Sequence, residues 1–111
     1  MTWKEYEEVQ KQICKENGAD WQATPPDFII GLATNLDKTP IYGVRDIRSD
    51  QTSGWYIWSG EYSAADDFYK PVCAAHLVDL FPSVIHYLGL AEGWRFIIDK
   101  DGYEDIWYEQ D

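Results

Sequence analysis

The fold of this chain can be worked out from one run of residues, Gly54-Trp55-Tyr56-Ile57-Trp58-Ser59-Gly60-Glu61. Residues 55–59 of this run are predicted to form a strand. Successive side chains of a strand point to opposite faces, so Trp55 and Ile57 share one face and Tyr56 and Trp58 share the other. Aromatic residues on both faces predict a sheet with one face covered by helices and the other partly open.

Two further strands are predicted before this run. Residues 28–33 form a short apolar segment typical of a buried strand, and residues 41–48 form a second strand-like segment. The intervening residues 35–40 are a turn, so we expect these two strands to pair as a hairpin. The polar residues 48–54 are expected to form an exposed loop.

A second hairpin is predicted near the C-terminal end. Its strands are residues 93–99 and 103–109, joined by the turn Asp99-Lys100-Asp101-Gly102. Trp94 and Phe96 share a face of the first of these strands. We expect that face to lie in the core.

The opening segment is predicted to be a helix. Thr2 and Glu5 form a capping box, in which each side chain satisfies a free amide of the first turn. Gly18 offers the left-handed residue that ends a helix. Apolar residues with helical spacing form a stripe for packing, namely Trp3, Tyr6, Val9, Ile13 and Cys14.

Short helices are predicted in the middle of the chain. Ser63 and Asp66 form a second capping pattern, which opens a short helix through Phe68 and Tyr69. Pro71 suits the first position of a further helix that ends before Pro82. Another short helical piece follows over residues 84–88 and stops at Gly89.

Strands, short helices and a final hairpin together predict an α+β fold. We expect an antiparallel sheet of about five strands, with the N-terminal helix and two or three short helices packed on one face. A chain of this length forms one domain, so we predict a single domain over residues 1–111. Within it, the helix occupies residues 1–18 and the α+β core occupies residues 27–109. The uncovered face of the sheet is the expected working surface.

The chain is acidic, and its charge is unevenly spread. Nine basic and twenty acidic residues give a net charge of −11. Residues 1–49 carry six basic and eight acidic residues (−2), whereas residues 50–111 carry three and twelve (−9). Because nucleic acids and anionic membranes would be repelled, neither is expected as the direct partner. A cationic protein would be attracted, although acidity also serves solubility alone.

The chain is expected to work in the cytoplasm. Its N-terminus is charged and lacks the apolar segment of a signal peptide, and no window is apolar enough to span a membrane. Cys14 and Cys73 are too few for a disulfide framework, so we expect both thiols to be reduced.

Catalytic and metal-binding patterns are weak. Cys73, His76 and His86 lack the further ligands of a metal site, which favours a buried thiol with core histidines. The same residues lack the local context of a cysteine nucleophile. Asp99-Lys100-Asp101-Gly102 resembles the start of a calcium loop but lacks its bidentate Glu, so a hairpin turn is favoured. We predict no enzymatic activity, no cofactor and no metal.

A combination of aromatic and acidic residues remains as the candidate site. Trp and Tyr dominate the energetics of many interfaces because they bury a large area with few rotatable bonds. Carboxylates accept paired hydrogen bonds from Arg. The candidate partner-binding residues with these properties are Trp58, Glu61, Asp66, Asp67, Glu104, Asp105 and Trp107. The competing interpretation is that the large aromatic residues simply fill the core of a small sheet.

Several short segments of the chain form a recognisable set: residues 54–61, Asp66-Asp67-Phe68-Tyr69, His76-Leu77, Pro82, Tyr87-Leu88, Gly93-Trp94-Arg95-Phe96 and Tyr103-Glu104-Asp105-Ile106-Trp107. Together they resemble a bacterial immunity-protein domain of the immunity protein 33 type. The resemblance covers roughly residues 27–109 and consists of structural residues rather than a catalytic motif.

This resemblance implies a small cytosolic protein that binds a cognate bacterial toxin and neutralises it without chemistry. The charge of the chain favours a cationic toxin. Replacing Asp66 and Asp67 by Ala is then expected to slow association and to weaken its salt dependence. Two alternatives stay open: the aromatic face binds a small ligand such as a sugar, or the chain is a general protein-interaction module.

Overall fold

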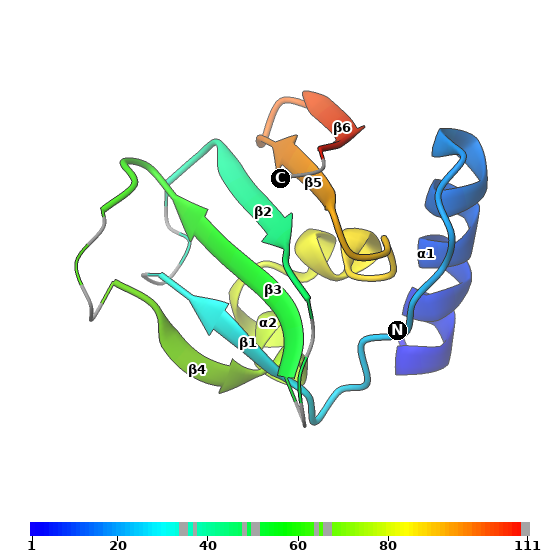
Figure 1. Ribbon diagram of the computed structural model, residues 1–111, viewed down its shortest axis with the longest axis horizontal. Helices are drawn as coiled ribbons and strands as arrows, with labels where there is room; N and C mark the ends of the chain where they lie inside the picture. Colours follow the sequence, from blue (N-terminus) through cyan, green and yellow to red (C-terminus); the bar gives the residue numbers. More distant parts are fainter. Residues whose placement is uncertain are drawn as a thin grey trace.

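Six strands build one sheet in the part of the chain that the computed structural model describes, namely residues 1–33, 36, 38–47, 49, 52–63, 65 and 68–109. Along the chain they are β1 (Ile29–Leu32), β2 (Ile41–Arg45), β3 (Thr52–Ser59), β4 (Lys70–Cys73), β5 (Trp94–Ile98) and β6 (Glu104–Tyr108). In space their order is β4–β1–β3–β2–β5–β6 (Figure 1). The α+β class is confirmed, with one strand more than expected.

Strand β3 pairs with two partners, and this corrects the first predicted hairpin. β1 runs parallel to β3 on one side and β2 runs antiparallel to β3 on the other, so β1 and β2 are not neighbours in the described sheet. The predicted turn at residues 35–40, of which 35 and 37 lie outside the described residues, indicates only that the chain reverses. The longer β3 offers an edge to each of these short strands. β2 ends at Arg45 and β3 begins at Thr52, earlier than predicted. Residues 48, 50 and 51 of the predicted loop lie outside the described residues.

Strand β4 replaces part of a predicted helix. The predictions of helix at Phe68, Tyr69 and Pro71 are wrong. β4 is an edge strand whose neighbour is β1, and the Ala74 N–H donates to the Phe28 carbonyl at the end of this pairing. Alternation along the strand then turns the Pro71 nitrogen away from β1. Proline is tolerated at such a position because no ladder hydrogen bond is lost. Asp66, part of the predicted cap, lies outside the described residues.

The short helices lie on one face of the sheet, as predicted, whereas the N-terminal helix packs against them. Three short segments follow β4 directly: η1 (Ala74–His76), α2 (Leu77–Leu80) and η2 (Pro82–Tyr87). In Figure 1 the sheet lies in front of them. The N-terminal helix α1 (Trp3–Asn17) packs against η2.

Helix α1 has the ends that the sequence predicts. The Thr2 N–H donates to Glu5 Oε1 at 2.9 Å, and the Glu5 N–H donates to Thr2 Oγ1 at 3.2 Å. Gly18 follows the helix in the left-handed region, at φ 69°, where glycine is preferred. Tyr6 and Cys14 are buried, so the apolar stripe faces the core.

Arg45 is a buried cation that joins the sheet to the segments around it. It is 1% exposed, and a charge so placed requires hydrogen bonds to be stable. Its guanidinium donates to backbone carbonyls at 2.8–3.2 Å, those of Gln22, Ala23, Ser53, Leu88 and Leu90. Arg45 therefore ties the segment after α1 and the residues after η2 to the central strands.

Candidate functional site

The face of the sheet opposite the helices is open, and its side chains can be read from the strand register. Trp58 of β3 lies opposite Tyr42 of β2, Tyr42 lies opposite Ile97 of β5, and Ile97 lies opposite Asp105 of β6. Residues directly opposite one another share a face. One row on the open face therefore begins at Trp58 and ends at Asp105. With four strands spaced by about 4.8 Å, this row is about 14 Å long.

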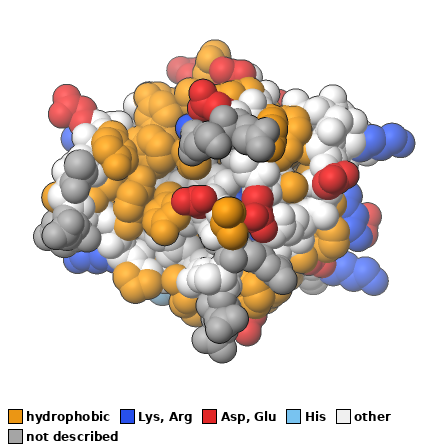
Figure 2. All heavy atoms as spheres, in the orientation of Figure 1, with side chains coloured by type: hydrophobic (Ala, Val, Ile, Leu, Met, Phe, Trp, Pro, Cys, Tyr) orange, Lys and Arg blue, Asp and Glu red, His pale blue; other side chains and the backbone are white. Residues whose placement is uncertain are grey.

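A second row lies beside the first. It consists of Tyr56 on β3, Val44 on β2, Arg95 on β5 and Trp107 on β6. Figure 2 views the open face and shows hydrophobic side chains gathered over the sheet, with acidic side chains among them and Lys and Arg mostly at the margins. Three of the predicted site residues thus share the open face, namely Trp58, Asp105 and Trp107.

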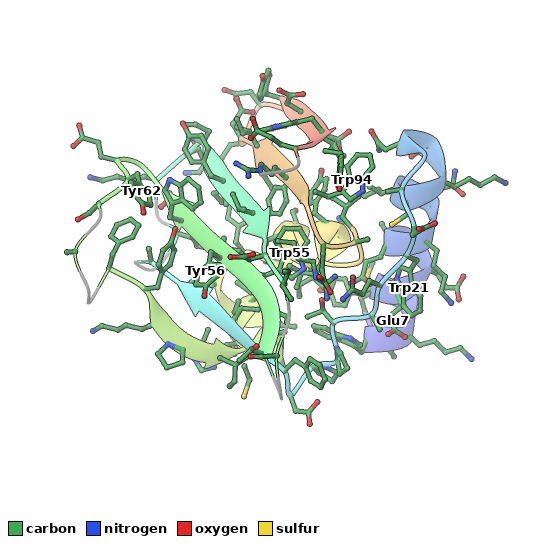
Figure 3. All side chains as sticks on the ribbon, viewed as in Figure 1. Glu7, Trp21, Trp55, Tyr56, Tyr62 and Trp94 are labelled. Atoms are coloured by element: carbon green, nitrogen blue, oxygen red, sulfur yellow. The ribbon has the colours of Figure 1, made fainter. Side chains whose placement is uncertain are left out.

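Aromatic rings form a continuous cluster at the β3 end of the open face. Among the described residues, neighbouring ring centroids in this cluster are 4.9–6.3 Å apart. We call it the aromatic cluster, and its members are Tyr42, Tyr56, Trp58, Tyr62, Phe68 and Tyr69. Tyr42 and Trp58 stack at 5.2 Å with an interplanar angle of 12°. Tyr56 and Tyr62, labelled in Figure 3, are 42% and 62% exposed.

The other end of the open face is formed by the β5–β6 hairpin, which we call the acidic hairpin (residues 94–109). Residues 99–109 carry five carboxylates and one lysine, a balance of 1 − 5 = −4. Asp105 is exposed on the open face. On the same face, Arg95 Nη1 lies 2.9 Å from Glu109 Oε2. The aromatic cluster and the acidic hairpin thus occupy opposite ends of one surface.

Glu104 differs from the other predicted site residues. Alternation along β6 turns it to the helix side, where the Tyr87 hydroxyl donates to Glu104 Oε2 at 2.6 Å. Burial and this hydrogen bond raise the pKa of Tyr87, so the phenol stays protonated as a donor. Glu104 therefore anchors β6 to η2. Glu61 is exposed just beyond β3, and Asp66 and Asp67 lie outside the described residues.

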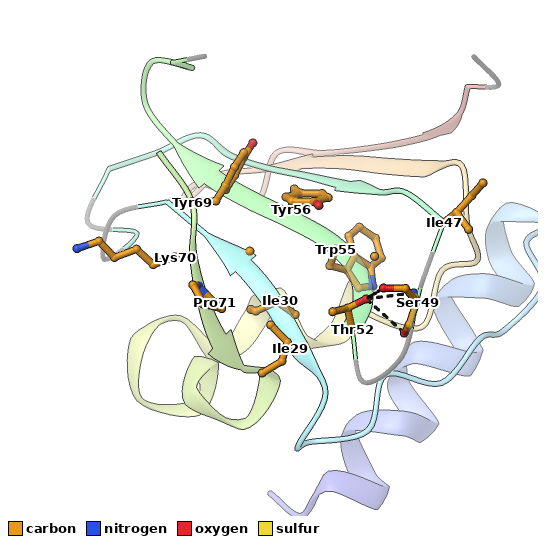
Figure 4. A pocket seen from close by; sticks show the side chains of 12 residues that line it. Ile29, Ile30, Ile47, Ser49, Thr52, Trp55, Tyr56, Tyr69, Lys70 and Pro71 are labelled. Carbon is orange, nitrogen blue, oxygen red and sulfur yellow. Dashed lines mark hydrogen bonds between the residues drawn. The ribbon is translucent and has the colours of Figure 1, made fainter. Parts of the chain in front are cut away.

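A pocket of about 290 Å³ opens beside the aromatic cluster (Figure 4). Tyr56 and Tyr69 line one part of it, and Ser49 and Thr52, whose hydroxyl oxygens are 2.8 Å apart, line another. Ile47 also lines it and is 78% exposed. Burial raises the pKa of Tyr69 to about 12, so its hydroxyl is uncharged at neutral pH. The pocket can receive an apolar group or a sugar ring.

The structure places the two cysteines and the two histidines in different surroundings. Cys14 and Cys73 are both free thiols. The prediction of a buried thiol with a core histidine is wrong for Cys73 and His76, which are exposed because edge strand β4 and η1 face solvent. Across the described ranges, no three His, Cys, Asp or Glu side chains converge as a metal site would require. None of the helices in this part of the chain has the length and apolar character of a membrane span.

Several aromatic residues of the open face are not among the predicted site residues. Tyr42 was detectable, because alternation within residues 41–45 separates it from the buried Ile41. Phe68 and Tyr69 carried no such signal, since they join the aromatic cluster only through the placement of β4 beside β1.

Comparison with known families gives one match. The family model of the Imm33-like domain matches residues 9–109. The matched range includes all the strands of the described sheet, and with them the aromatic cluster and the acidic hairpin. The resemblance to the immunity protein 33 type is therefore confirmed. No curated protein and no solved structure matches the chain.

Proposed function

The chain belongs to the Imm33-like domain family, and from this membership we propose that it is a non-catalytic immunity protein of the bacterial cytoplasm. In this proposal it binds a cognate toxin domain and neutralises it by covering the toxin's working surface. The open face of the sheet is the surface that binds. The aromatic cluster supplies apolar contact area, and the acidic hairpin supplies charge.

One observation carries the choice of surface. The row from Trp58 to Asp105 sets stacked aromatic rings and an exposed carboxylate on a sheet face that no helix covers in the described part of the chain. Exposed aromatic groups that are contiguous, rather than scattered, are typical of surfaces that a partner covers. Tyr56 and Tyr62 are the most exposed rings of this cluster.

The charge of the chain supports a cationic toxin. A net charge of −11 attracts a basic domain over a distance and raises its rate of encounter. At short range, the Asp105 carboxylate is suited to accept hydrogen bonds from Arg or Lys of the toxin. The aromatic cluster would then slow dissociation, because burying large rings contributes most of the energy at an interface.

This proposal predicts that the gene directly upstream of this one ends in a toxin domain, and the test uses that domain. Wild-type chain is expected to rescue cells that express this domain and to bind it in calorimetry. Trp58→Ala is expected to weaken binding by at least about tenfold, the effect of removing a central aromatic anchor. Glu16→Ala, on the exposed side of α1, serves as the control and should bind like wild type. A wild-type chain that neither binds nor rescues would overturn the proposal.

A second candidate function is the binding of a small ligand, which the pocket lined by Tyr56, Tyr69, Ser49 and Thr52 favours. Sugar rings stack on aromatic side chains and hydrogen-bond to nearby hydroxyls. The measurement is the melting temperature of the chain with and without a panel of simple sugars. A rise that Tyr56→Ala abolishes would favour this candidate over toxin binding.

A further inference from the structure

Strand β6 forms one end of the sheet, and the direction of its backbone groups can be worked out. The Asp99 N–H donates to the Tyr103 carbonyl, and the Glu109 N–H donates to the Gly93 carbonyl. In an antiparallel pair, residues bonded to the neighbour alternate with residues that point away from it. The residues of β6 whose N–H and carbonyl groups point away from β5 are therefore Glu104, Ile106 and Tyr108.

These outward groups face solvent. Glu104 and Tyr108 are exposed, and Ile106 is partly exposed. Within the described ranges, their N–H groups make no backbone hydrogen bond outside the β5–β6 ladder. A strand in this state is a template on which another strand can pair.

The two edge strands of the sheet, β4 and β6, differ in how strongly they are protected against pairing with a further strand. The opposite edge, β4, begins with Lys70 and Pro71, residue types that block the addition of a strand. β6 contains neither Pro nor a basic residue. In β6, negative charge is what opposes the addition of a further strand, because residues 99–109 have a charge balance of −4.

The negative charge of residues 99–109 indicates which kind of strand can pair with β6. Two copies of this chain joined through β6 would bring together two segments 99–109, each with a charge balance of −4, which is unfavourable. A strand that carries Lys or Arg would instead place its cations against Asp105 on the open face or Glu104 on the helix side. We propose that β6 pairs with an extended, basic segment of the toxin, so that the sheet continues into the partner. This inference rests on the proposed function and adds how the complex is built.

Amide hydrogen exchange of the full chain, free and bound to an inactivated form of the toxin domain that the proposed function predicts, tests this pairing. The amides of Ile106 and Tyr108 are expected to exchange at least about tenfold more slowly in the complex, as amides newly hydrogen-bonded to a partner do. A complex that leaves these amides unprotected would overturn the pairing while the toxin proposal stands. If wild-type chain forms no complex, both fail.

Substitutions provide a second measurement. Ile106→Pro removes an outward N–H without breaking the β5 ladder, and Ile106→Ala controls for the lost side chain. We expect Ile106→Pro to weaken toxin binding by about tenfold more than Ile106→Ala, the effect of one interfacial hydrogen bond. Equal weakening would overturn the pairing. Should Ile106→Pro fail to fold, Tyr108→Pro and Tyr108→Ala form the equivalent pair. Sedimentation of the free chain as a dimer that Ile106→Pro dissociates would assign the edge to a second copy instead.

Discussion

Gly43 of β2 lies directly beneath the ring of Phe96 on β5. The two residues are paired in the register of the strands, and a Cβ on Gly43 would come within 2.1 Å of Phe96 Cε2. Phe96 also stacks on Tyr87 of η2, with ring centroids 4.9 Å apart. The absence of a side chain at Gly43 therefore lets one ring bridge the sheet and the helical layer.

Gly43→Ala is expected to destabilise the chain by about 1–3 kcal/mol, because the added methyl group overpacks the core. The measurement is the free energy of unfolding in urea. In a Phe96→Leu background the same substitution should cost less, since the smaller side chain leaves room. An equal cost in both backgrounds would contradict the steric explanation.

Arg45→Met is expected to lower the free energy of unfolding by at least about 3 kcal/mol, because several buried carbonyls lose their donor. Lys11→Met is the matched control: its ion pair with Glu8 is long, at 3.8 Å, and exposed, and its ammonium lies over the Trp21 ring at 4.7 Å from the centroid, so the loss should be at most about 1 kcal/mol. Similar losses for both variants would show that the buried network of Arg45 contributes little.

The partial burial of His86 leads to a prediction of how the free energy of unfolding depends on pH. Burial lowers its pKa, so the unfolded chain binds a proton at a higher pH than the folded chain does. The contribution of neutral His86 is therefore fully present above the unfolded pKa of about 6.5 and is lost as the pH falls through the folded value. Urea unfolding at several pH values below neutrality should show a decline that His86→Gln reduces. His76→Gln, at an exposed histidine, is the control and should keep the decline.

The two cysteines should differ in reactivity. Cys14 is buried, its Sγ donates to the Gly89 carbonyl at 3.4 Å, and burial raises its pKa to about 11. At pH 8, about one Cys14 thiol in a thousand is then ionised. A thiol reagent should modify one equivalent per folded chain quickly, at the exposed Cys73. Cys73→Ser should remove this fast phase. Rapid modification of the Cys73→Ser variant would place Cys14 within reach of solvent.

Asp105→Asn tests the charge of the open face. We expect the rate of association with the proposed toxin domain to fall about 2- to 5-fold at low salt, and to depend less on salt than that of wild type. Glu16→Gln changes the net charge equally on the exposed side of α1 and should slow association less. Association rates that fall equally for both variants would indicate that only total charge matters, and not its position on the open face.

Much of the local structure is predictable from residues that are close in sequence. The capping box of Thr2 and Glu5 places the start of α1, and Gly18 places its end. The final hairpin follows from its turn, and the alternation of Trp55 and Tyr56 separates the buried face of β3 from the open one. Each of these features depends on contacts within a few residues, so local chemistry determines them.

Tertiary structure decides which strands are neighbours and therefore what the open face contains. β1 lies parallel to β3 although the sequence predicts a hairpin of β1 with β2, and β4 forms a strand although Pro71 suits a helix. The aromatic cluster follows from the placement of β4 beside β1. The contact of Glu104 with Tyr87 and the position of β6 at the edge of the described sheet follow from the pairing of β5 with β2, which sets the final hairpin against η2. Such features depend on contacts between residues far apart in sequence, whose energies are set by the assembled sheet and core rather than by local propensity.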